Sequence, residues 1–76
     1  MTDQRQKQIE IECCTDPANL IGTDGSVRSY WQDMKELIRA CDGVNTNLIF
    51  VEHRREGSVH GYPVTEGRLR RIGVNI

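Results

Sequence analysis

The 76-residue sequence is poor in aromatic residues and has no long apolar run. Phe, Trp and Tyr together make up 5% of the chain, which is thin support for a nucleic-acid-binding face built on stacked bases. No apolar stretch approaches the roughly 20 residues that cross a bilayer, and the polar start of the chain lacks the apolar core of a signal peptide. We therefore expect a protein that is neither inserted in a membrane nor targeted to one.

Cysteine is scarce and irregularly placed. The chain has three cysteines, an odd number with Cys13 and Cys14 adjacent, which does not make a disulfide framework. Their spacing matches no zinc-binding pattern, and a catalytic thiol would need a base and an anion-stabilising site that the sequence does not supply. We expect a reducing, cytoplasmic setting, no metal site, no cofactor and no enzymatic activity.

The composition that remains is that of an ordinary globular protein, with 28% charged and 37% hydrophobic residues and a formal charge of -1. We predict one domain over 1–76, with loose residues at 1–7. A chain this short buries a smaller fraction of its surface than a larger one, so any second apolar surface is a candidate contact between copies. Net charge is uneven along the chain, because all five basic residues of 47–76 are arginines opposed by only three glutamates.

Residues 26–41 carry the clearest apolar period. The apolar residues from Val27 to Cys41 recur at the three- and four-residue spacing of an amphipathic helix. Before this segment, Ile9, Ile11 and Cys13 alternate with glutamates, which predicts an edge strand over 8–14. The loop that follows contains Asp16 before Pro17, a pattern that predicts a single capped helical turn at 17–19.

The segment 48–53 is apolar on both faces, unlike the strand expected at 8–14. Leu48 and Phe50 would lie on one face, and Ile49 and Val51 on the other. Because one helix covers one sheet face, we predict that a second copy of the chain covers the other and that these four residues form a homodimer face.

Glu56-Gly57 separates this strand from a third one at 58–64 and predicts a two-residue hairpin loop. That register places His53 opposite His60, where two imidazoles could share a metal ion or form a pH-sensitive contact. Two ligands alone do not make a zinc site, so no metal is assigned. Pro63 cannot donate to a ladder and marks an edge strand, and the alternation of 68–76 predicts a final strand.

The fold class predicted is α+β, with the order β-α-β-β-β and one amphipathic helix packed on a small, mostly antiparallel sheet. Such a meander would gather one partner-binding set near one sheet edge. That set is Arg54, Arg55, Arg68, Arg70, Arg71 and Tyr62.

Arginine suits contacts with carboxylates, phosphates and aromatic faces. The first functional hypothesis is a small non-enzymatic binding or accessory module, of inhibitor or adaptor type, that contacts an unknown protein partner and forms a homodimer. An alternative is a nucleic-acid-binding protein that uses the arginine cluster. A third hypothesis is a small-anion binder at the start of the predicted helix, where Gly22 to Ser26 would present free amides.

Overall fold

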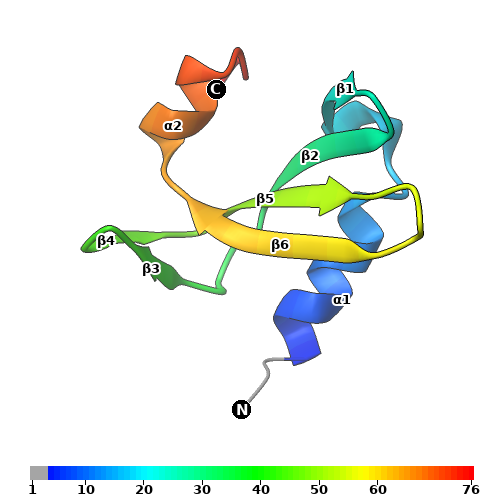
Figure 1. Ribbon diagram of the computed structural model, residues 1–76. Helices are drawn as coiled ribbons and strands as arrows, with labels where there is room; N and C mark the ends of the chain where they lie inside the picture. Colours follow the sequence, from blue (N-terminus) through cyan, green and yellow to red (C-terminus); the bar gives the residue numbers. More distant parts are fainter. Residues whose placement is uncertain (1–3) are drawn as a thin grey trace.

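The computed structural model describes residues 4–76 and has an α+β architecture, a small antiparallel sheet with a helix packed on it (Figure 1). The elements in chain order are α1 (Gln4–Cys13), the 3-10 turn η1 (Pro17–Asn19), β1 (Leu20–Asp24), β2 (Val27–Asp33), β3 (Arg39–Cys41), β4 (Val44–Thr46), β5 (Leu48–His53), β6 (Val59–Val64) and α2 (Glu66–Arg71). The predicted class is confirmed, whereas the predicted order β-α-β-β-β is wrong.

The main sheet has the strand order β1-β2-β5-β6, and every neighbouring pair is antiparallel. Strands β3 and β4 form a separate hairpin between β2 and β5, which projects from one end of the sheet (Figure 1). Residues paired across neighbouring strands share a face of the sheet, so the register assigns every side chain of β2, β5 and β6 to one of two faces.

The first face is covered by α1 and holds the core. The buried cluster consists of Cys13, Tyr30, Met34, Leu37, Ile49 and Val51. Helix α1 also comes close to β6, where the Glu10 side chain lies over Gly61. A Cβ atom on Gly61 would stand 2.5 Å from two Glu10 side-chain carbons, so a larger residue at this position requires the Glu10 side chain to move.

The second face carries an aromatic row. Trp31 pairs with Phe50, and Phe50 pairs with Tyr62, which places the three rings on adjacent strands. Helix α2 covers part of this face, and its Leu69 is fully buried. Trp31 lines a hollow with the C-terminal segment after α2, so the chain itself covers one end of the row.

The helix predicted over 26–41 is wrong. Val27 to Asp33 form a strand, and the chain then turns into β3. Gly25-Ser26 makes a two-residue hairpin loop with Gly25 at φ +62°, and this loop pairs β1 with β2. β-Branched and aromatic residues at the start of β2 favour a strand. Tyr30, Met34 and Leu37 are nevertheless buried, as the helical period also required.

The strand predicted over 8–14 is also wrong, and part of the segment predicted to be loose, residues 4–7, belongs to a helix. Gln4–Cys13 form α1, and residues 1–3 lie outside the described residues. Gln, Lys, Arg and Glu are strong helix formers, and here they outweigh a short alternation of isoleucines. Ile9 and Cys13, four residues apart, both pack into the core, whereas Ile11 is exposed.

The C-terminal strand predicted over 68–76 is a helix and an irregular tail. Thr65 caps α2 by accepting a hydrogen bond from the Arg68 amide, Glu66 lies in the first turn, and the left-handed Gly73 follows the last turn. These are ordinary start and stop signals of a helix. They outweigh the alternation of Ile72, Val74 and Ile76 in this segment.

Two local predictions, the capped turn at 17–19 and the hairpin after residue 53, are confirmed. Asp16 caps η1 through its side chain, and β5 and β6 form the predicted hairpin with β6 at the sheet edge. Its register is shifted by one residue, because Arg54 pairs with Ser58 around a three-residue loop that ends at the left-handed Gly57.

Candidate functional site

A surface groove of about 470 Å³ lies on the aromatic face between α2 and β1. Phe50, Tyr62, Val64, Leu69 and Ile72 supply its apolar lining. The polar walls come from Thr23, Asp24, Ser29 and Arg68. We call this the α2 groove. Its lining combines apolar side chains with four polar ones, a mixture typical of a binding site.

The floor of the α2 groove is an aromatic pair. The ring centroids of Phe50 and Tyr62 are 5.3 Å apart with the planes tilted by 36°, a favourable arrangement for two rings. Tyr62 remains 41% exposed, so its ring is available to a ligand. Partial burial and the carboxylate of Glu52 raise the pKa of the Tyr62 phenol, and the nearby Arg68 opposes this shift. The phenol therefore stays protonated and can donate a hydrogen bond at neutral pH.

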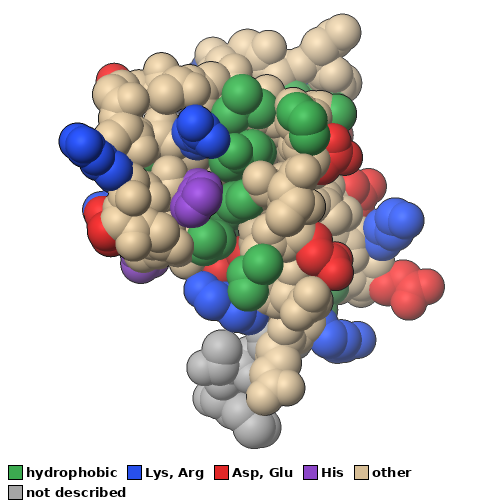
Figure 2. All heavy atoms as spheres, turned by 90° about the vertical axis from the view of Figure 1, so that its right-hand side faces the viewer, with side chains coloured by type: hydrophobic (Ala, Val, Ile, Leu, Met, Phe, Trp, Pro, Cys, Tyr) green, Lys and Arg blue, Asp and Glu red, His purple; other side chains and the backbone are tan. Residues whose placement is uncertain are grey.

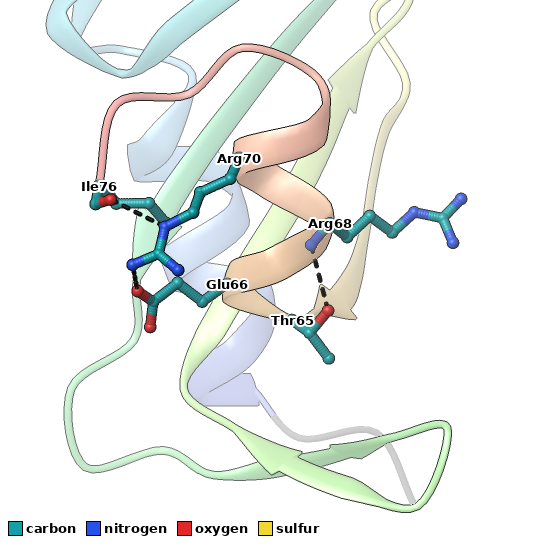
Figure 3. Close-up of polar contacts among 5 residues, drawn as sticks. All are labelled: Thr65, Glu66, Arg68, Arg70 and Ile76. Carbon is teal, nitrogen blue, oxygen red and sulfur yellow. Dashed lines mark hydrogen bonds and ion pairs between the residues drawn. The ribbon is translucent and has the colours of Figure 1, made fainter.

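Arg68 lies on α2 beside this floor. Its backbone amide is used by the Thr65 cap, whereas its guanidinium extends away from the other labelled side chains (Figure 3). The guanidinium makes no hydrogen bond or ion pair with any residue of 4–76, and Leu69 next to it anchors the helix in the core. A cation without a partner among residues 4–76 therefore lies at the rim of the groove, on a helix that Leu69 anchors.

The other α2 arginines are placed differently. Arg70 donates to the Glu66 carboxylate and, at 3.0 Å, to the carbonyl of Ile76 (Figure 3). This contact ties the C-terminal segment to α2. Arg71 is exposed and does not line the α2 groove. Of the three, only Arg68 is positioned to bind a ligand in the groove.

Arg54 and Arg55 lie elsewhere, at the start of the β5–β6 loop. There they line a second hollow together with Arg28 and His53. The predicted partner-binding set is therefore divided among α2, β6, which carries Tyr62, and this loop. Sequence reasoning missed Arg28 because residues 26–41 were assigned to a helix. The Gly25-Ser26 turn signal was the feature that could have placed Arg28 on a strand beside β5.

The predicted histidine pair is not formed. His53 pairs with Val59 and His60 pairs with Glu52, so the two imidazoles belong to opposite faces of the hairpin. The cause is the one-residue register shift, which moves every β6 side chain to the other face. Among residues 4–76 no group of three His, Cys, Asp or Glu side chains could hold a metal ion.

The predicted dimer face is also divided between two faces. Ile49 and Val51 are fully buried beneath α1, which leaves Leu48 and Phe50 as the half-buried members. The sheet thus has a helix over each face within one chain, α1 on one side and α2 over part of the other. Of the four residues predicted to form the dimer face, only Leu48 and Phe50 are available for contact with a second copy.

The cysteines are free thiols. Burial raises the pKa of the Cys13 thiol to about 12, with smaller contributions from Cys14 and Asp16. The pKa of Cys14 is raised as well, first by burial and then by Glu10. A raised pKa opposes the thiolate that nucleophilic chemistry requires, and Cys13 packs as a small apolar core residue.

Comparisons of this chain with protein-family models, with curated proteins and with solved structures found no match. Within residues 4–76, neither helix has the length and apolar character needed to pass through a bilayer.

Proposed function

We propose that this chain is a small non-enzymatic binding module that acts by protein–protein contact through the α2 groove. The observation that carries the proposal is the exposed Tyr62 ring in a groove of about 470 Å³ that the Arg68 guanidinium also lines, without a partner among residues 4–76. Tyrosine and arginine are the residue types that most often dominate the energy of a protein interface.

The groove favours a partner segment that carries an apolar side chain next to a carboxylate. The apolar side chain would lie on Phe50 and Tyr62, and the carboxylate would accept hydrogen bonds from Arg68 and the Tyr62 phenol. Asp24 on the opposite wall disfavours a second acidic group on that side. One apolar and one acidic position therefore define the expected motif.

The lining supports binding rather than catalysis. The α2 groove has hydroxyl groups from Thr23 and Ser29, but neither a histidine nor a cysteine lines it. A nucleophilic serine or threonine needs an adjacent base within hydrogen-bond reach. The three free cysteines support the cytoplasmic, reducing setting that we also propose.

A peptide-display selection against the immobilised chain tests this function. We expect enriched peptides that combine an apolar residue with Asp or Glu. Arg68→Glu and Tyr62→Ala should each weaken the binding of such a peptide by about tenfold or more, measured by fluorescence polarisation. Arg71→Glu is the matched control, because Arg71 is also an exposed α2 arginine but lies outside the groove.

The proposal fails if selection yields no acidic motif, or if Arg71→Glu weakens binding as much as Arg68→Glu. Circular dichroism of each variant separates loss of binding from loss of the fold. Arg68 is exposed, so its substitution provides the test even if Tyr62→Ala unfolds the chain.

The other two functional hypotheses receive less support. The nucleic-acid alternative needs the five arginines to act as one cluster, but they lie on two separate elements, and Arg70 is engaged by Glu66 and Ile76. The helix N-terminus required by the anion hypothesis is absent, because Gly22 to Ser26 lie in β1 and its turn. An anion site near that turn would need a different physical basis.

A further inference from the structure

A second hollow, of about 380 Å³, lies where the β1–β2 turn meets the start of the β5–β6 loop. We call it the basic pocket, and the side chains that define it are Thr23, Ser26, Arg28, His53, Arg54 and Arg55. Figure 2 looks onto this side of the molecule, where basic and His side chains lie on the left with an acidic group beside them, and both signs of charge are mixed on the right.

The sheet register brings the members of the basic pocket together. Thr23 pairs with Arg28, and Arg28 pairs with His53, so the three side chains form one row across β1, β2 and β5. Side chains directly opposite on antiparallel strands have Cβ atoms about 5 Å apart. Arg54 and Arg55 follow His53 directly, which adds two further guanidinium groups to the end of the row.

The positive charge of the basic pocket is only partly compensated. No Asp or Glu of residues 4–76 lines it. Arg54 has an ion pair with Glu52 at 4.0 Å, whereas the guanidinium groups of Arg28 and Arg55 make no hydrogen bond or ion pair within the described part of the chain. The whole chain has a formal charge of -1, so this local excess is not a consequence of a generally basic composition.

We propose that the basic pocket binds a phosphomonoester group. Guanidinium groups form paired, charge-assisted hydrogen bonds with phosphate oxygens. The hydroxyl groups of Thr23 and Ser26 and the imidazole of His53 supply further donors at the same place. A dianion placed among these groups removes the repulsion between Arg28, Arg54 and Arg55.

A single phosphomonoester fits better than a nucleic-acid strand. The cations converge on one compact hollow instead of following a track along the surface, which a run of phosphodiesters would need. None of the residues that line the basic pocket is a Phe, Tyr or Trp, so it offers no ring on which a base could stack.

The test is an NMR titration of the isotope-labelled chain at low ionic strength. The probes are inorganic phosphate, free phosphoserine and a phosphoserine peptide, with sodium chloride at matched ionic strength as the blank. We expect phosphate-dependent shifts confined to the amides of Gly25, Ser26 and the start of the β5–β6 loop. Arg28→Gln or Arg55→Gln should each weaken binding by about tenfold, and Arg71→Gln should leave it unchanged.

The three probes also identify the source of the phosphate. Tighter binding of the peptide than of free phosphoserine assigns the site to a phosphorylated protein, and equal binding assigns it to a small phosphorylated ligand. The absence of shifts in the millimolar range overturns the proposal, as does an equal effect of Arg71→Gln. Arg28-dependent binding of single-stranded DNA that is tighter than any phosphomonoester also overturns it.

This proposal stands or fails separately from the α2 groove. Tyr62 and Arg68 do not line the basic pocket, and Arg28 and Arg55 do not line the groove. The Arg68→Glu variant should therefore keep its phosphate response, while Arg28→Gln should keep its affinity for a groove-binding peptide.

Discussion

At the scale of single residues, Gly61 is the one glycine of residues 4–76 at which an added Cβ atom would meet another side chain, that of Glu10. The Glu10 side chain is largely buried, and its carboxylate accepts a hydrogen bond from the Gln6 amide at 3.2 Å and lies 3.6 Å from the Lys7 ammonium. These contacts hold the side chain over β6, where a methyl group on Gly61 would collide with it. The position of α1 on the sheet therefore depends on a residue with no side chain.

We predict that Gly61→Ala lowers the free energy of unfolding by about 1–3 kcal/mol, the usual cost of overpacking a tight contact. The measurement is urea denaturation followed by circular dichroism. Gly22→Ala is the control, because a Cβ atom there would meet nothing within 4 Å.

The double variant Glu10→Ala with Gly61→Ala identifies the cause. If the collision with Glu10 is the reason, the two substitutions together should cost clearly less than the sum of their separate costs. Additive costs would mean that Gly61 matters for another reason.

At the scale of elements, sequence reasoning succeeded where a turn fixed the structure locally. The β5–β6 hairpin and the capped turn at Asp16 were predicted because Gly57, Asp16 and Pro17 act over a few residues. Sequence reasoning failed at Ser26 to Cys41, because the apolar spacing of this segment is compatible with a helix and also with a strand followed by a turn. The strand won because β1 and β5 pair with both of its edges, a long-range effect that local spacing does not reveal.

The same reasoning explains which site residues were found. Tyr62 and Arg68 were named from their residue types and from a predicted meander that would gather them at one sheet edge, and both line the α2 groove. The groove itself was not predictable, because its walls come from β1 and α2. The sequence predicted a loop in place of β1 and a strand in place of α2. Arg28 was missed for the same reason.

Helix α2 should respond to substitution in two directions. Thr65→Ala removes the hydroxyl that caps the helix by accepting a hydrogen bond from the Arg68 amide, with 3.3 Å between the nitrogen and the oxygen. This substitution should lower the free energy of unfolding by about 1 kcal/mol. Gly67 lies within the helix, where an added Cβ atom meets nothing within 4 Å. Gly67→Ala should therefore raise the free energy of unfolding by about 0.5–1 kcal/mol. Thermal and urea denaturation measure both changes. Two effects of the same sign would show that α2 is not the helix that these residues define.

At the scale of the whole molecule, homodimerisation stays a prediction on a smaller surface. The original reason, a strand apolar on both faces with one helix to cover it, is weakened because α1 and α2 both lie over the sheet. Sedimentation velocity at tens of micromolar tests it. A dimer that dissociates on Phe50→Ser would support contact through Leu48 and Phe50, and a monomer would contradict the prediction.

The free edge of β6 decides how copies of this chain could join through their main chains. The bond from the Arg54 amide to the Ser58 carbonyl sets the ladder so that Val59, Gly61 and Pro63 direct their main-chain groups outward. Pro63 has no donor, and the Val59 carbonyl accepts from Lys7 at 3.0 Å. Pairing with a strand of a second copy is therefore disfavoured at β6. This leaves β1, the other edge of the main sheet, as the place where such a strand could add. Two copies joined at β1 would present β6 at both outer ends, so the assembly would be self-terminating and would not grow into a fibre.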